Sequence, residues 1–211
     1  MRLLIVGLLS FFVVSVSTGC DNKTDRKNRY LNQGKEQLEA KNYDKARISF
    51  KNVLQIDPND QEGLYQFGKL NEAKQEFQQA FGFYNKVLEL NPNHVAANLA
   101  IAKFYLAGNV LDKAEASIAV VLAVEPNSPD ALVLRAALLT RKSDNNGATA
   151  IIDGVLAKNP QHREALAMKI GMHTDANEDD KAQTILDTAR NSYPNDVTFL
   201  SLQSRLYKKL G

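Results

Sequence analysis

The side chains that could carry out chemistry are few in this sequence of 211 residues, and their spacing does not assemble a catalytic centre. His94 and His162 stand two units apart in a repeated pattern, so they are not spaced as paired metal ligands. His173 takes a helix position that normally packs, and the carboxylates of residues 178–180 form a run of the kind that is usually only solvated. The phosphate-binding GxxxxGK[ST] and GxGxxG motifs and the GxSxG nucleophile motif are absent from the sequence. We therefore expect no catalytic residue, no cofactor and no metal, and predict that the protein is not an enzyme.

The single cysteine, Cys20, has flanks that suit covalent attachment of lipid. It follows a basic residue, Arg2, and an apolar run at residues 3–16, which is shorter than the roughly 20 residues of a membrane-spanning helix. The segment VSTGC at residues 16–20 resembles the lipobox of bacterial lipoproteins. This resemblance implies cleavage after residue 19 and a diacylglyceryl thioether on Cys20. An uncleaved signal anchor, or a plain signal peptide with an incidental cysteine, are the two alternatives.

The N-terminal segments therefore predict a targeting signal and a membrane anchor. Residues 1–19 are expected to form a lipoprotein signal peptide, and residues 20–28 a lipidated flexible tether, because residues 21–28 include no apolar side chain. By resemblance to lipoprotein sorting in enterobacteria, Asp21 favours the inner over the outer membrane, a choice that stays open. We expect a protein of the bacterial cell envelope that faces the periplasm.

Composition and charge exclude several classes of protein. Hydrophobic residues make up 44% of the chain and charged residues 24%, which excludes wholesale disorder, a collagen-like chain and a disulfide scaffold. The 26 basic and 24 acidic residues leave a net charge of +2, which is too balanced to indicate a nucleic-acid partner.

Prolines divide the rest of the chain into equal pieces. Five of the six recur every 34 residues, at Pro58, Pro92, Pro126, Pro160 and Pro194. With this proline at place 32 of a 34-residue unit, the units are residues 27–60, 61–94, 95–128, 129–162 and 163–196, with a partial unit at 197–211. A proline cannot continue a helix and keeps the preceding residue out of the α region, so each unit should end there.

The columns of this repeat show where helices pack. Place 20 holds alanine in every complete unit: Ala46, Ala80, Ala114, Ala148 and Ala182. Place 24 holds Phe50, Tyr84, Ile118, Ile152 and Leu186, and place 27 holds Val53, Val87, Val121, Val155 and Ala189. Small residues are required where two helix axes approach closely, and bulky apolar residues fill the groove between helices. The columns therefore predict a helical hairpin in each unit.

This pattern is that of the tetratricopeptide repeat (TPR) family, which the chain resembles over residues 27–211. The sequences NYDKA at 42–46 and VLQIDPN at 53–59 carry the likeness most clearly. The resemblance implies an all-α solenoid, a right-handed superhelix of antiparallel helix pairs with about 11 helices after the signal segment. Each unit should form helix A, a turn near places 15–16 and helix B, and stacked units should share a continuous core.

The resemblance also implies where a partner binds, because helix A lines the concave surface of TPR proteins. Place 9 holds Lys35, Lys69 and Lys103 in the first three units, and place 5 holds Leu31, Tyr65 and Leu99. Ammonium groups beside apolar contacts suit an extended or helical peptide that carries carboxylates. The alternative is that the lysines are solvated and at most steer association. Lys35 replaces the asparagine of the TPR carboxylate clamp, so the specificity of that clamp is not expected here.

The later units depart from the pattern. Place 8 becomes Ile170, place 17 becomes Asp179 and place 28 becomes Arg190, so the fifth unit is expected to be the loosest. In the last segment, apolar residues cover about 160° of the expected helix, wider than the ~100° stripe of a surface helix. A capping helix, a continuation into more repeats, or an edge that contacts a partner or a second copy would each explain this arc.

These observations together predict a non-catalytic scaffold or adaptor for protein–protein interaction, tethered to a membrane by Cys20. The chain is similar to TPR lipoproteins linked with PEP-CTERM sorting and exopolysaccharide export, which implies a role in envelope biogenesis. The alternative is an outer-membrane lipoprotein that assists assembly of a pilus secretin or of outer-membrane proteins. The expected partners are a protein or peptide in the concave groove and the membrane, with self-association through the C-terminal helix left open.

Overall fold

The periodic prolines separate pairs of helices along the whole described chain. The structure, a computed structural model, describes residues 22–210, and within this range it contains eleven helices and no strand. They are α1 (Lys23–Glu39), α2 (Tyr43–Ile56), α3 (Gln61–Ala73), α4 (Phe77–Leu90), α5 (Val95–Ala107), α6 (Leu111–Val124), α7 (Pro129–Arg141), α8 (Asn145–Lys158), α9 (Arg163–Asp175), α10 (Asp179–Ser192) and α11 (Val197–Leu210). The all-α fold and the helix count are as predicted.

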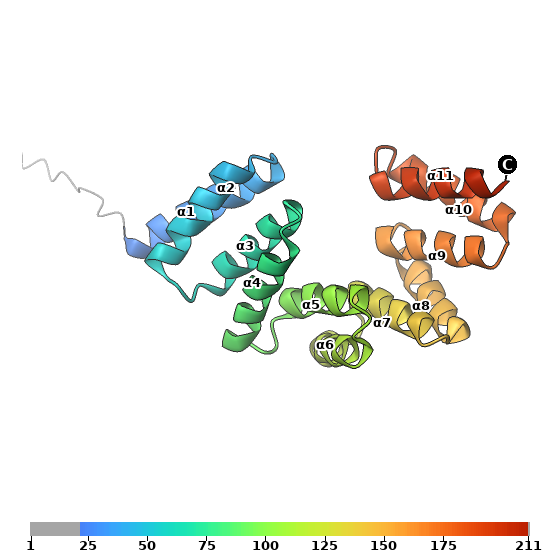
Figure 1. Cartoon of the computed structure of the whole chain (residues 1–211), viewed down its shortest axis with the longest axis horizontal. Helices are drawn as coiled ribbons and strands as arrows, with labels where there is room; N and C mark the ends of the chain where they lie inside the picture. Colours follow the sequence, from blue (N-terminus) through green and yellow to red (C-terminus); the bar gives the residue numbers. More distant parts are fainter. Residues whose placement is uncertain (1–21, 211) are drawn as a thin grey trace, which may run out of the picture.

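The hairpins stack side by side into an open arc (Figure 1). The odd-numbered helices are the A helices and the even-numbered helices are the B helices of the repeat. Each B helix ends two residues before its proline, and the one residue between them is held out of the α region, as Asp57 (φ −142°, ψ 97°) and Asn91 (φ −145°, ψ 91°) illustrate. This conformation follows from the steric clash between a proline ring and the residue before it.

The turn between helices A and B has the same backbone in every complete unit. Place 15 adopts the left-handed conformation, with φ between 55° and 65°, and none of its residues is a glycine: Lys41, Gln75, Asn109, Ser143 and Asn177. One such residue at the end of helix A reverses the chain and lets helix B begin two residues later. The predicted turn at places 15–16 is therefore confirmed.

The core lies between the helices of each hairpin and continues from one hairpin to the next. All five place-20 alanines are fully buried, together with the bulky residues at place 24. A Cβ on Gly68 would lie 2.5 Å from Cε1 of Tyr84, so this glycine makes room for the ring. Gly68 is at place 8 and Tyr84 at place 24. At these two places the third and fourth units pair alanine with isoleucine, and the fifth unit pairs Ile170 with Leu186, both fully buried. The core thus accommodates a large residue at place 8 of the fifth unit, facing a side chain smaller than Phe50 or Tyr84.

The expected flexible tether is wrong over residues 23–28, because α1 begins at Lys23. Asn22 caps this helix by accepting a hydrogen bond from the Thr24 N–H at 3.2 Å, and Asp25 lies in its first turn, where the helix dipole favours an acid. The ammonium group of Lys27 forms ion pairs with Asp60 and, at 3.3 Å, with Asp57. The Asn22 cap and these ion pairs stabilise the helical conformation of this polar segment.

The predicted signal peptide, residues 1–19, and the lipidation residue Cys20 lie outside the described residues. Among residues 22–210, no helix combines the length and the apolar character that crossing a membrane requires.

Candidate partner-binding groove

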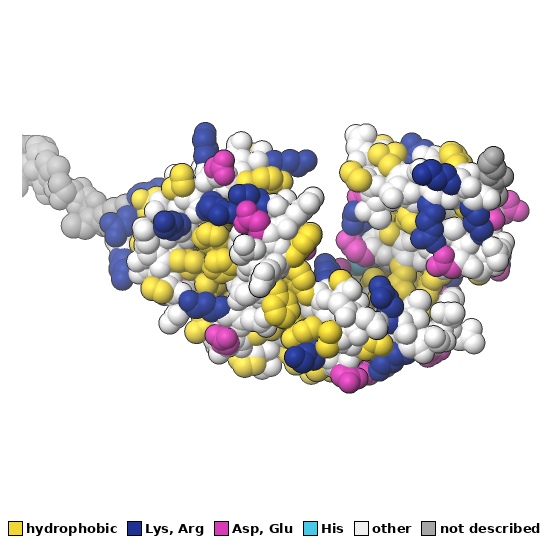
Figure 2. All heavy atoms as spheres, viewed as in Figure 1, with side chains coloured by type: hydrophobic (Ala, Val, Ile, Leu, Met, Phe, Trp, Pro, Cys, Tyr) yellow, Lys and Arg dark blue, Asp and Glu magenta, His cyan; other side chains and the backbone are white. Residues whose placement is uncertain are grey.

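The A helices of the second and third units line a cavity of about 550 Å³. Its walls include Tyr65 and Lys69 from α3, Tyr84 from α4, Leu99 and Lys103 from α5, and Asp130 from α7. We call this cavity the lysine groove. The space-filling view shows apolar side chains grouped beside basic ones on the N-terminal arm of the arc (Figure 2).

Two cations of this groove are available to a ligand. Lys69 and Lys103 are exposed, and neither forms an ion pair with another residue in the described range. They hold the same place on neighbouring A helices, and Leu99 and the ring of Tyr65 line the groove with them. The groove therefore presents positive charge next to apolar surface.

Lys35 and Leu31 do not belong to the lysine groove. The Lys35 ammonium lies 2.6 Å from Oε1 of Glu62, which also accepts a hydrogen bond from the Gln66 side chain at 3.0 Å. Burial by itself raises the pKa of Glu62, but these hydrogen bonds outweigh it and hold the pKa below its usual range. Leu31 packs against the core of the first unit. Four of the six predicted groove residues therefore line this one cavity: Tyr65, Lys69, Leu99 and Lys103.

The ring of Tyr84, which the sequence pattern assigned to the core alone, forms part of the groove beside Tyr65. The Tyr84 hydroxyl donates a hydrogen bond to Oε2 of Glu72 at 2.8 Å, and its ring centroid lies 5.6 Å from that of Tyr65. Burial, and then this bond to a carboxylate, raise the pKa of Tyr84, so the phenol stays protonated and keeps donating. Glu72 is thereby engaged and competes less for the lysines. The aromatic type of place 24 was visible in the sequence, but its reach to the groove was not.

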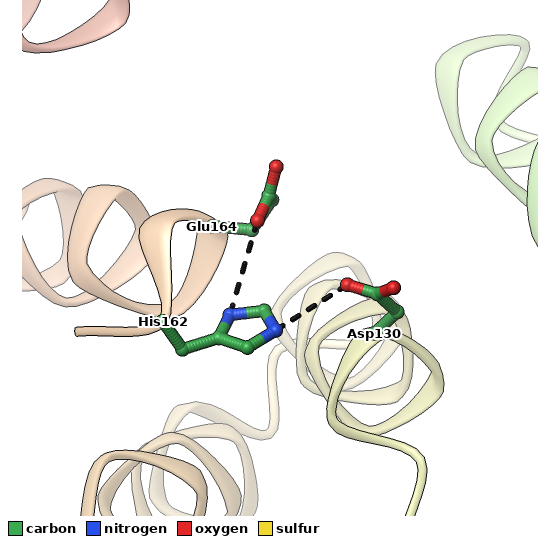
Figure 3. Close-up of side chains that lie close together, drawn as sticks. All are labelled: Asp130, His162 and Glu164. Carbon is green, nitrogen blue, oxygen red and sulfur yellow. Dashed lines mark ion pairs between the residues drawn. The ribbon is translucent and has the colours of Figure 1, made fainter. Parts of the chain in front are cut away.

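A second cluster, at the end of the groove wall, joins Asp130, His162 and Glu164 (Figure 3). Nδ1 of His162 accepts a hydrogen bond from the Ala165 N–H at 3.3 Å and so caps α9. The ring proton must then be on Nε2, which lies 3.3 Å from Oδ1 of Asp130. Both ring nitrogens are engaged in these contacts, and the hydrogen bond to Nδ1 gives His162 a role in helix capping.

His94 has the same role at the start of α5. Its Nδ1 accepts a hydrogen bond from the Ala97 N–H at 3.2 Å. The two histidines thus share place 34 with Asp60 and Asp196, whose carboxylates also accept hydrogen bonds from the backbone of the helix that follows. The sequence showed that the histidines occupy equivalent turns; the shared column with aspartate was the signal for capping.

Helical hairpins that stack side by side in an open arc define an α-helical repeat protein. Tetratricopeptide repeat family models match residues 28–60, 64–138 and 139–206, which is most of the chain. The chain therefore belongs to the tetratricopeptide repeat family. No curated protein matches it in sequence.

Solved structures share the fold at low sequence identity. A thermophilic TPR protein of Thermus thermophilus superposes with a TM-score of 0.71 at 18% identity, over 87% of this chain and 98% of that one. PilF of Pseudomonas aeruginosa gives 0.68 at 15% identity, over 89% and 86% of the two chains. PilW, described as a widely conserved type IV pilus biogenesis factor, gives 0.65 at 19%, over 86% and 85%. Likeness at these identities shows the fold alone.

Proposed function

We propose that this protein is a non-catalytic scaffold that binds a partner protein in the lysine groove while a lipid on Cys20 holds it at an envelope membrane. The observation that carries the proposal is the pairing of two unengaged ammonium groups, of Lys69 and Lys103, with the exposed edges of Tyr65 and Leu99 in one cavity. The TPR fold supports a scaffold, because proteins of this family bind other proteins on this surface.

The groove favours a partner segment that carries carboxylates beside an apolar side chain. Two ammonium groups in neighbouring units fit acids spaced along an extended or helical peptide. The acidic side chains of the groove already have partners, since Glu72 accepts from Tyr84 and Asp130 faces His162. Their negative charge therefore opposes an acidic ligand less than two free carboxylates would.

A crosslinking experiment in cells tests this assignment. A photo-crosslinking residue in place of Ala96, which lines the groove, should give a discrete adduct with one envelope protein. The same residue in place of Ala123, an exposed position on α6, is the matched control and should not form this adduct. The same adduct from both positions, or none from position 96, would remove the groove from the proposal.

The membrane anchor is proposed from the lipobox-like segment before Cys20 and from the short apolar run at residues 3–16. Cys20→Ser should abolish incorporation of labelled palmitate and leave the protein unprocessed or released from the membrane fraction. Unchanged labelling in this variant would show that the anchor is elsewhere. Asp21 supports the inner membrane, and the similarity to PEP-CTERM-linked TPR lipoproteins supports a role in exopolysaccharide export or protein sorting.

The fold of two solved structures favours a second candidate, a role in pilus assembly at the outer membrane. PilF and PilW share the fold over most of both chains, and PilW is described as a pilus biogenesis factor. Fractionation of inner and outer membranes separates the candidates. Recovery of the protein with the outer membrane supports the pilus or barrel-assembly role, and recovery with the inner membrane supports export or sorting.

A further inference from the structure

The first turn of α1 follows closely on the residue that is proposed to carry lipid. Only residues 21 and 22 separate Cys20 from Lys23, where the helix begins. Because a chain extends by at most about 3.6 Å per residue, the Cα atom of Lys23 lies within about 11 Å of that of Cys20. The headgroup layer is roughly 5–8 Å thick on each side of a bilayer. A lipid on Cys20 therefore keeps the first turn of α1 within reach of this layer.

The end of the first hairpin that contains this turn is basic. Lys23 and Arg26 are exposed, and neither forms an ion pair with another residue in the described range. They lie three residues apart, so they share one side of α1. Lys27, by contrast, is engaged by Asp57 and Asp60. The space-filling view shows basic side chains gathered at this N-terminal end of the arc (Figure 2).

A hollow of about 320 Å³ opens between this side of α1 and the last turns of α2. Among the described residues, its lining combines two cations, two amides, a phenol and an aliphatic side chain, without a carboxylate: Lys23, Arg26, Asn52, Gln55, Tyr30 and Ile56. The nearest acid in the sequence, Asp25, lies about 160° round the helix from Lys23, so it is directed away from the hollow. The hollow is therefore a concave surface rich in hydrogen-bond donors for an anion.

We propose that this basic end of the first hairpin binds the headgroups of anionic phospholipids in the membrane that holds Cys20. The inference rests on the proposed lipid anchor and adds a second contact with the same membrane. Phosphate oxygens accept hydrogen bonds from ammonium, guanidinium and amide groups, and all three kinds of donor line the hollow. A tyrosine such as Tyr30 suits the boundary between headgroups and water, because its ring is apolar and its hydroxyl is polar.

The covalent anchor favours lipid over a soluble anion as the occupant. Basic residues close to a membrane are attracted to a negatively charged leaflet. Attachment at Cys20 makes this encounter intramolecular, so the headgroups are present at a high effective concentration. Acyl chains alone would let the arc turn about its anchor. With α1 bound as well, the first hairpin lies against the surface, and the lysine groove of the next two units keeps a constant orientation to the membrane.

The experiment uses the absence of tryptophan from the sequence. Asn59→Trp places one reporter in the exposed turn next to Pro58, which lines a second hollow together with Lys23. Asn195→Trp places it at the equivalent, exposed position of the fifth unit. Each lipidated protein is inserted into phosphatidylcholine vesicles that carry a spin label on some headgroups, with or without phosphatidylglycerol. We expect phosphatidylglycerol to increase quenching at least twofold for Asn59→Trp and to leave it unchanged for Asn195→Trp.

Matched charge changes test which end of the hairpin makes the contact. Lys23→Glu with Arg26→Glu should remove the effect of phosphatidylglycerol on the Asn59→Trp reporter. Lys41→Glu with Lys45→Glu, the same charge change at the opposite end of the same hairpin, should preserve it. Added salt should weaken the contact, because it screens exposed charges. Circular dichroism verifies that each variant is folded.

The anchor is measured separately from the headgroup contact. Mass spectrometry detects lipid on Cys20, and flotation detects protein bound to vesicles. Protein without this lipid would overturn the anchor and this proposal with it. Lipidated, floating protein would overturn the headgroup contact alone if its quenching ignored phosphatidylglycerol or persisted in Lys23→Glu with Arg26→Glu. Loss of the quenching on addition of inorganic phosphate at constant ionic strength would also overturn it, by assigning the hollow to a soluble anion.

Discussion

Tyr84 fills the space that a side chain at position 68 would need. Gly68→Ala should therefore lower the free energy of unfolding by about 1–3 kcal/mol, because the new Cβ would lie 2.5 Å from the ring. Gly82→Ala, in α4 with no neighbouring atom within 4 Å of the added Cβ, should raise it by about 0.5–1 kcal/mol through helix propensity. Urea unfolding of both variants measures this difference, and equal effects would contradict the size pairing of places 8 and 24.

The capping role of His162 leads to a second prediction for single residues. His162→Ala removes the acceptor of the Ala165 N–H and should destabilise the protein by about 0.5–2 kcal/mol. Addition of zinc to the unaltered protein should leave its melting temperature unchanged, since neither ring nitrogen is available. A zinc-dependent rise in melting temperature that disappears in His162→Ala would instead assign a metal to this cluster.

The lowered pKa of Asp196 makes the stability of the folded protein depend on pH in the acid range. Hydrogen bonds from the Arg163 guanidinium, at 2.5 Å to Oδ2 and 3.0 Å to Oδ1, lower the pKa of Asp196 from its ordinary 3.8 to about 2. Because the pKa is lower in the folded state, the stabilisation is complete above about pH 4 and is lost as the pH falls towards 2. Asp196→Asn should reduce the loss of melting temperature between pH 4 and 2, and a slope equal to that of the unaltered chain would exclude this contribution.

At the scale of helices and turns, the A-to-B turn carries a conformational cost in every complete unit. Left-handed backbone is unfavourable for residues with a Cβ, and asparagine tolerates it better than glutamine does. Gln75→Gly should therefore raise the free energy of unfolding by up to about 1 kcal/mol, and Asn109→Gly should change it less. Thermal unfolding of the two variants makes the comparison, and a destabilised Gln75→Gly protein would contradict it.

Element boundaries were predictable wherever proline sets them. The helices after each periodic proline begin at the predicted residues, for example at Gln61, Val95 and Arg163. The start of α1 was not predictable in this way, because it depends on the Asn22 cap and on the ion pairs of Lys27 with the next turn. Polar composition indicates solvent exposure, and it does not distinguish a tether from a capped helix.

The candidate site was predictable to the extent that it follows the repeat. Periodicity alone placed Lys69 and Lys103 on neighbouring A helices, and the structure brings them to one cavity. It could not show that Lys35, at the same place, is engaged by Glu62, because that contact depends on which acid happens to lie on the next helix. The reach of Tyr84 into the groove likewise depends on the missing side chain at Gly68.

At the scale of the whole molecule, the two place-9 lysines that form no ion pair within residues 22–210 lie in the N-terminal half of the arc. Place 9 changes to Ala137 and Gly171 in the fourth and fifth units, and Arg205 in α11 is paired with Asp175. The lysine groove thus lies in the half of the chain closer in sequence to Cys20.

The most direct test of this account is the affinity of the crosslinked envelope partner, once purified, for two charge-reversed proteins. Lys69→Glu with Lys103→Glu should weaken binding at least tenfold while the melting temperature stays within a few degrees. Lys51→Glu with Lys86→Glu, the same charge change on exposed positions of α2 and α4, should weaken it far less. Equal loss in both double variants, or undiminished affinity in the first, would contradict recognition by the lysine groove.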